Sequence, residues 1–73
     1  MSKRTFLRVF RAATGATPIA YLIGVRIRRA AELLRQGGVT VTEAAMRVGF
    51  EDSNYFSRQF RKVMGVTPRS YAR

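Results

Sequence analysis

Residues 53–71 read SNYFSRQFRKVMGVTPRSY, and residues 3–21 read KRTFLRVFRAATGATPIAY. The two segments agree at eight of nineteen aligned positions, where residue frequencies of roughly 5–10% would give about one or two identities by chance. The identical pairs are Phe6/Phe56, Arg8/Arg58, Phe10/Phe60, Arg11/Arg61, Gly15/Gly65, Thr17/Thr67, Pro18/Pro68 and Tyr21/Tyr71. The repeat indicates that the chain presents the same basic helix twice, which suits a protein that reads two adjacent stretches of one polymer.

The first copy is predicted to form a helix that a glycine terminates. Phe6, Val9, Phe10 and Ala13 follow the i, i+3, i+4, i+7 spacing of one apolar helix face, and the glycine after them can end the helix. A second helix is expected from 18 to about 35, because its Thr-Pro start supplies a capping residue and a favourable first position. Its buried stripe is expected to contain Ile19, Leu22, Ile27, Ala30 and Leu34, widened by Ile23, Ala31 and Leu33.

Residues 41–64 are predicted to form a helix, a tight turn and another helix. Thr40 and Glu43 have the spacing of a capping box, Gly49 can end the short helix, and Asp52 can cap the next one. The apolar stripe of that last helix is expected to be Phe56, Phe60 and Val63. This order is the helix-turn-helix layout that places one helix in the major groove of DNA.

The charge balance indicates a polyanionic partner. Fourteen Lys and Arg residues oppose four acidic residues, which gives a net charge of +10 and a pI near 11.7. Twelve of these cations are Arg, whose guanidinium group pairs with phosphate and with the guanine edge. Because the chain has no His and no Cys, we expect no disulfide, no metal site, no cofactor and no enzymatic activity.

The helix of the second copy carries polar side chains opposite its phenylalanines. Ser53, Asn54, Ser57, Arg58 and Arg61 are expected to share this face. Asn suits adenine, Arg suits guanine and Ser suits either, so the first four are expected to contact bases and Arg61 a phosphate. An ordinary solvated helix face is the alternative.

The matching face of the first copy contains Lys3, Arg4, Leu7, Arg8 and Arg11. Arg4 and Arg8 suit guanine and are expected to contact bases, whereas Lys3 and Arg11 are expected at phosphates. Leu7 is a base candidate because it could touch a thymine methyl group. Alternatively, Leu7 packs on a segment outside this chain.

Three more residues are candidates for phosphate contacts. Tyr55 lies at the margin of its helix face, where it either packs or reaches a phosphate. Lys62 and Arg69 either contact phosphates or remain solvated charges. The middle helix would span about 27 Å, and successive major-groove faces lie about 34 Å apart, so one chain could place both basic helices on a target that need not be palindromic.

A set of motifs runs through both halves of the chain. In the second half they are Ala44-Ala45, Val48-Gly49-Phe50, Asp52, Tyr55-Phe56-Ser57-Arg58, Phe60-Arg61-Lys62, Gly65, Thr67-Pro68 and Tyr71. In the first half they are Phe6, Arg8, Phe10, Gly15, Thr17-Pro18, Tyr21-Leu22, Arg26, Ala30 and Leu33-Leu34. Together these motifs resemble the C-terminal DNA-binding domain of the AraC/XylS family of bacterial transcription regulators.

The resemblance implies an all-α fold of tandem, homeodomain-like helix-turn-helix subdomains joined by a long linker helix. The implied parts of an AraC-type domain over 1–73 are a motif-one recognition helix at 2–16, the linker at 17–36, the second helix-turn-helix at 40–64 and a C-terminal helix at 67–73. Each recognition helix would enter a major groove of double-stranded DNA. Base contacts would come from Arg4, Leu7, Arg8, Ser53, Asn54, Ser57 and Arg58. Members of the family usually activate transcription by contacting RNA polymerase.

The family domain also has parts that this sequence does not contain. It begins with a scaffold helix and the first helix of motif one, which would precede Ser2, and most members carry a separate effector-binding or dimerisation domain. The first motif is therefore expected to be incomplete, with Phe6, Leu7 and Phe10 partly uncovered.

The residues leave other classes of function open. A basic amphipathic helix can bind RNA or an anionic membrane without sequence preference, although the phenylalanines here lie on apolar stripes rather than where bases would stack. A fragment too incomplete to fold is a further alternative. No stretch has the ~18 apolar residues of a membrane span, and the N-terminus lacks the apolar core of a signal peptide, so a cytoplasmic, nucleoid-associated protein without membrane contact is expected.

Overall fold

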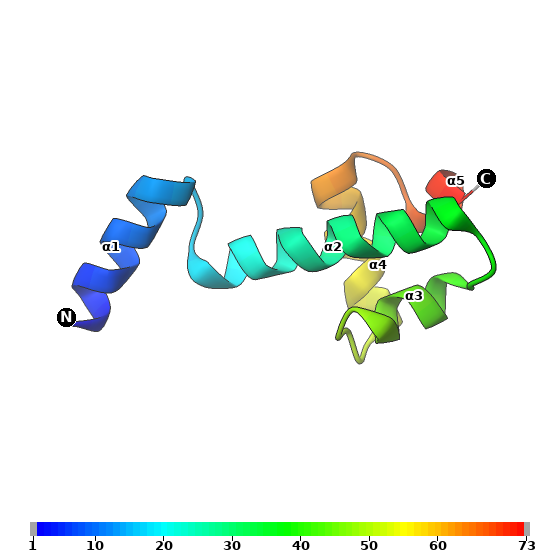
Figure 1. The fold of residues 1–73 in the computed structure, drawn as a ribbon, viewed down its shortest axis with the longest axis horizontal. Helices are drawn as coiled ribbons and strands as arrows, with labels where there is room; N and C mark the ends of the chain where they lie inside the picture. Colours follow the sequence, from blue (N-terminus) through cyan, green and yellow to red (C-terminus); the bar gives the residue numbers. More distant parts are fainter. Residues whose placement is uncertain (1, 73) are drawn as a thin grey trace.

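The computed structural model describes residues 2–72, and this range forms five helices joined by short turns. They are α1 (Lys3–Thr14), α2 (Pro18–Gln36), α3 (Val41–Arg47), α4 (Ser53–Met64) and α5 (Pro68–Ala72). The molecule measures 44 × 21 × 19 Å along its principal axes. Figure 1 shows α1 at one end, α2 along the long axis, and α3, α4 and α5 gathered around the C-terminal half of α2. The predicted all-α class is confirmed for the described residues.

The helices begin at side chains that satisfy otherwise unpaired backbone N–H groups. The capping box at α3 is confirmed: the Glu43 N–H donates to the Thr40 hydroxyl at 3.1 Å, and the Thr40 N–H donates to the Glu43 carboxylate at 3.0 Å. That second hydrogen bond lowers the pKa of Glu43. The caps of Thr17 on α2 and Asp52 on α4 are also confirmed. Local sequence therefore fixes where these helices start.

The turn between α3 and α4 depends on Gly49. Its φ of +98° lies in the left-handed region, which side chains other than glycine rarely adopt. A Cβ built at this position would lie 3.2 Å from the Cζ of Arg26, so the guanidinium group of this α2 residue packs directly over the turn. The close approach connects the helix-turn-helix to the long helix beside it.

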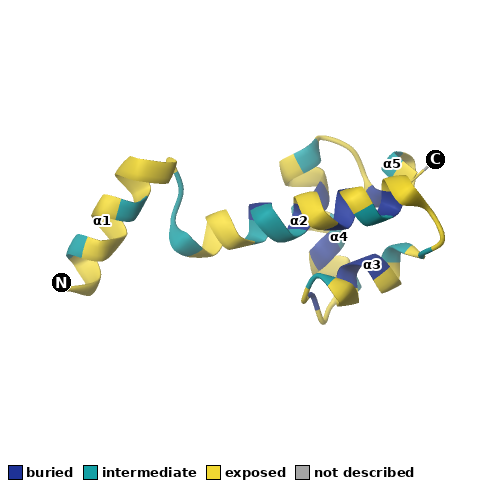
Figure 2. Ribbon diagram, in the orientation of Figure 1, coloured by how far each residue is buried: buried dark blue, intermediate teal, exposed yellow. Residues whose placement is uncertain are grey.

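The core lies between α2, α3 and α4, with Phe50 from the turn as a plug (Figure 2). Its largest fully buried side chains are Phe56, Phe60 and Ile27. Edge contacts link the aromatic rings, with centroid distances of 5.2 Å for Phe50–Phe56 and 5.6 Å for Phe60–Tyr71. The other buried members of this core cluster are Ala30, Ala31, Leu34, Ala44 and Ala45.

Part of the predicted apolar stripe is wrong. On α2, Ile19 is 74% exposed and Leu22 is 47% exposed, because α3, α4 and α5 gather around the C-terminal half of α2 and leave its N-terminal half largely uncovered (Figure 2). On α4, Val63 is 38% exposed, and Met64 packs against the core in its place. The buried face of α4 thus continues from Phe60 at i+4.

The first helix differs from its repeat partner in what covers it. α1 has no buried residue, and within residues 2–72 it packs on α2 and on no other helix. Phe6 is 47% exposed and Leu7 is 39% exposed, and Phe10 is half-buried against Tyr21, with the ring centroids 5.6 Å apart. The expectation that these three side chains are partly uncovered is confirmed.

Candidate nucleic-acid interface

The outer face of α4 is set by the burial of its inner face. Phe56 and Phe60 are fully buried, and the helical period then turns Asn54, Arg58 and Arg61 outward. All three are exposed. A carboxamide and two guanidinium groups on one helix face match the donor and acceptor patterns of adenine, guanine and phosphate.

The two serines of α4 lie at the margin of this face rather than at its centre. Ser53 and Ser57 are half-buried, and Ser57 lines a surface depression with Val41, Thr67 and Pro68 at the junction with α5. Their hydroxyls therefore border the surface that Asn54 and Arg58 dominate. Arg69 lines the same depression and is exposed.

Tyr55 packs and is exposed at the same time. Its ring lies 5.9 Å from the ring of Phe50, while 37% of the residue remains exposed. The Arg58 Cζ lies 5.9 Å from the centre of the Tyr55 ring, a cation–π distance. The Tyr55 ring thus lies beside the guanidinium of a predicted base-contacting residue. This contact was not predicted from the sequence, although the i, i+3 spacing of the two residues carries the signal.

The corresponding face of α1 is exposed along its whole length. Lys3, Arg4, Leu7, Arg8 and Arg11 are all solvent-exposed, and the last three line a shallow depression with Thr17. Both α1 and α4 contain several cations and no acidic residue. Each helix therefore carries a net positive charge, although Glu51 and Asp52 directly precede α4 and weaken the field at its N-terminus.

The remaining candidate, Lys62, lies on the flank of α4 that faces the N-terminal half of α2. It is exposed and borders a depression shared with Thr17, Ile19, Gln59 and Val63. The predicted site residues therefore form two groups, one on α1 and one on α4 and α5, and the structure does not bring these groups into a single cluster.

The two groups are arranged along a common axis. In Figure 1, α1 and α4 both lie across the direction of α2, and both run from the lower to the upper side of the view. The 19 residues of α2 correspond to a length of about 28 Å. One turn of a duplex shifts a groove by about 34 Å without changing its direction, and α1 and α4 run the same way in this view at separate positions along α2.

Between residues 2 and 72, no three His, Cys, Asp or Glu side chains gather where they could hold a metal ion. None of the helices from α1 to α5 has the length and apolar character that crossing a bilayer would need.

A family model described as a helix-turn-helix domain matches residues 1–73. The MmsAB operon regulatory protein of Pseudomonas aeruginosa is 41% identical over 71 residues, which cover 97% of this chain and 23% of that protein. The HTH-type transcriptional activator RhaR of Cronobacter sakazakii is 46% identical over 69 residues, 94% of this chain and 24% of that protein. The chain thus spans about a quarter of the length of these curated relatives.

Solved structures share the fold. The DNA-binding domain of AdpA, solved in complex with a target DNA, superimposes with a TM-score of 0.89 at 39% identity, covering 99% of this chain and 65% of that one. The C-terminal domain of the response regulator yesN from Fusobacterium nucleatum gives 0.87 at 33% identity, with coverages of 100% and 71%.

Proposed function

The chain belongs to the AraC-type family of helix-turn-helix domains, and from that premise we propose that it binds double-stranded DNA sequence-specifically and thereby regulates transcription. One observation carries the proposal: two acid-free cationic helix faces, on α1 and α4, run in the same direction at separate positions along α2. The AdpA domain, which shares the fold, was solved with a target DNA, and this supports duplex DNA as the ligand.

In the proposed complex, α4 enters a major groove with its outer face toward the base edges. Asn54 would bind adenine and Arg58 guanine, because their side chains form bidentate hydrogen bonds with those bases. Ser53 and Ser57 would contact bases at the border of this face, where both are half-buried. The Tyr55 ring would hold the Arg58 guanidinium in position before DNA arrives.

The first helix would read the next major groove. Arg4 and Arg8 would contact guanines, and Leu7, which is 39% exposed, would lie against a thymine methyl group. Because α1 and α4 run the same way, their target would be two half-sites in direct orientation about one turn apart, rather than a palindrome.

Phosphate contacts would fix the register of the two helices. The proposed residues are all exposed, and they are Lys3, Arg11, Tyr55, Arg61, Lys62 and Arg69. Five of them are cations, so neutralising one phosphate each would give a slope of about −4.5 for log K against log salt concentration. This term would supply most of the affinity and none of the sequence preference.

The relatives support further parts of the proposal. One of the named relatives, RhaR, is a transcriptional activator, which supports activation through contact with RNA polymerase. A regulator of this type would act in the cytoplasm at the nucleoid and would bind DNA without catalysing a reaction. The relatives are about four times as long as the matched region, which leaves room for an effector-binding domain in proteins of that length.

Selection from a random duplex library tests the proposal. The selected sites should contain two conserved blocks about one turn apart, and DNase footprints should span both. Arg58→Ala should relax the base preference in one block by about 1–3 kcal/mol per contacted base pair. A footprint confined to a half-turn, or an equal loss of affinity for every sequence with Arg58→Ala, would refute base reading from two grooves.

A further inference from the structure

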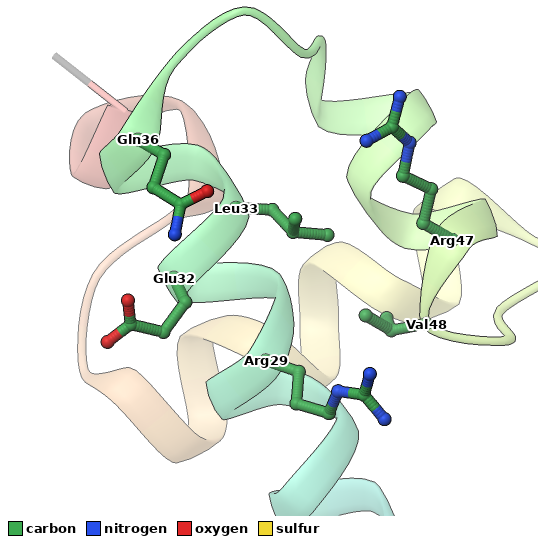
Figure 3. Close-up of a pocket in the computed structure, with 6 residues that line it drawn as sticks. All are labelled: Arg29, Glu32, Leu33, Gln36, Arg47 and Val48. Carbon is green, nitrogen blue, oxygen red and sulfur yellow. The ribbon is translucent and has the colours of Figure 1, made fainter.

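A surface groove of the helix-turn-helix contains charged and apolar side chains that have no role in the proposed DNA binding. It lies between α2 and α3, encloses about 430 Å³, and appears in close-up in Figure 3. The lining residues are Arg29, Glu32, Leu33 and Gln36 from α2, with Arg47 and Val48 from the end of α3. Leu33 and Val48 form its floor: both are half-buried, and in Figure 3 their side chains point toward each other.

Two arginines flank this apolar floor. The guanidinium groups of Arg29 and Arg47 lie on opposite sides of the Leu33–Val48 pair in Figure 3, and both residues are exposed. Two carboxylates lie near these arginines: Glu32 also lines the groove, and the charge of Arg47 adds to the Thr40 hydrogen bonds in lowering the pKa of Glu43. The Glu32 carboxylate points away from the groove in Figure 3, and the Glu43 carboxylate accepts a hydrogen bond from the Thr40 N–H at the other end of α3.

The groove opens away from the proposed DNA surface. α4 packs against both α2 and α3, and Figure 3 shows it behind the two helices when the groove faces the viewer. A duplex on the outer face of α4 therefore leaves Arg29 and Arg47 without a phosphate partner. This step rests on the proposed function, because it takes that face as the one that meets DNA.

We propose that this groove binds a short acidic segment of a partner protein while the chain is on DNA. An apolar side chain of the segment lies on Leu33 and Val48, and a carboxylate on each side of it pairs with Arg29 and Arg47. Guanidinium groups favour planar, bidentate pairing with carboxylates. Charge complementarity favours an acidic occupant, since two arginines and a single glutamate line the groove.

The probe is a fluorescein-labelled peptide of about twelve residues, with one leucine flanked by two glutamates on each side in a Gly-Ser background. Its binding to the 73-residue chain is measured by fluorescence anisotropy. The test variant is Arg29→Gln with Arg47→Gln. The matched control is Arg28→Gln with Arg35→Gln, which removes the same charge from exposed positions of α2 that do not line the groove.

The test variant should bind the peptide about tenfold more weakly, and the control should lose less than about threefold. With the unaltered chain, a peptide in which serine replaces the leucine should bind about fivefold more weakly. Equal losses in the two double variants, or equal binding of the leucine and serine peptides, would overturn the proposal. The serine comparison remains decisive if the test variant loses its helical circular dichroism.

A second arm separates this inference from the proposed function. A saturating duplex of the selected sequence, added to the peptide complex, should leave the anisotropy of the peptide at or above its starting value. Displacement of the peptide would show that the groove meets DNA, and the inference would fail. Peptide binding without DNA is scored by itself, so a chain that binds the peptide but no specific duplex would refute the proposed function alone.

Discussion

The internal repeat provides a matched pair of substitutions whose effects should differ widely. Phe56 and Phe6 occupy the same position in the two copies. Phe56 is fully buried, with ring centroids of Phe50 and Phe60 at 5.2 and 5.7 Å. Phe6 is 47% exposed, and the ring of Phe10 lies 5.9 Å away. We predict that Phe56→Ala destabilises the folded chain much more than Phe6→Ala does.

The expected magnitudes follow from burial. Replacing a core Phe with Ala costs about 3–5 kcal/mol, because the transfer energy is lost and a cavity remains. A chain of this length has roughly 4–11 kcal/mol of total stability, so Phe56→Ala removes a large part of it. Phe6→Ala should cost at most about 1 kcal/mol, since half of the residue is already in water and no enclosed cavity forms. Alanine also favours the helix over phenylalanine by roughly 0.5 kcal/mol.

Thermal and urea unfolding followed by circular dichroism at 222 nm measure both effects. At about 4–8 °C per kcal/mol for a domain of this size, Phe56→Ala should lower the melting temperature by about 15 °C or more, and Phe6→Ala by less than about 8 °C. Equal losses in the two variants would refute the reasoning, because they would place α1 inside the same cooperative core as α4.

Three further outcomes are expected. The Gly49→Ala variant should have a lower melting temperature than the Gly65→Ala variant. Both positions have positive φ, at 98° and 83°, with a backbone cost of about 1–2 kcal/mol, but only the Cβ at position 49 must displace the Arg26 guanidinium. Equal melting temperatures would contradict this contact. The hydrogen bond from the backbone N–H at the start of α3 lowers the pKa of Glu43. The stabilising effect of this hydrogen bond is therefore present above the unfolded-state pKa of Glu43 and is lost as the pH falls through its folded-state pKa. Glu43→Gln should thus make the free energy of unfolding, measured by urea titration, depend less steeply on pH on the acid side. An unchanged slope would argue against this. Lys62→Ala should weaken binding to all duplexes alike and make the salt slope less negative by about 0.9, whereas an altered base preference in salt titrations would assign a base contact instead.

The local features of the fold could be predicted because they depend on neighbouring residues. The capping box of Thr40 and Glu43 needs only the right side chains three positions apart, and the Phe56/Phe60 stripe needs only a helical period. The stripe on α2 was harder to place. A period shows that a helix has an apolar face, but the length of helix that other elements cover is a property of the whole fold, and Ile19 and Leu22 lie on the uncovered part.

The candidate site also has features that the sequence could predict and features that it could not. The sequence alone indicated polar, cationic faces on two helices, since the repeat and the phenylalanine spacing determine which side chains point outward. It could not show that Ser53 and Ser57 are half-buried, because their burial depends on how α4 packs beside α3 and α5. Nor could it show the contact of Tyr55 with Phe50, which requires the turn and the helix to be placed together.

The two copies of the basic helix therefore have different supports in spite of their shared sequence. α4 packs on α2, α3 and α5, and its inner face is fully buried at Phe56 and Phe60, whereas α1 packs on α2 alone and has no buried residue. A helix with few buried contacts lies at the low end of local stability, and ordering it on a ligand consumes part of the binding free energy. Since a base contact discriminates only when its side chain is held in place, the proposed reading of DNA by this chain depends more on Arg58, with Tyr55 beside it, than on Arg8 at the matching position of α1.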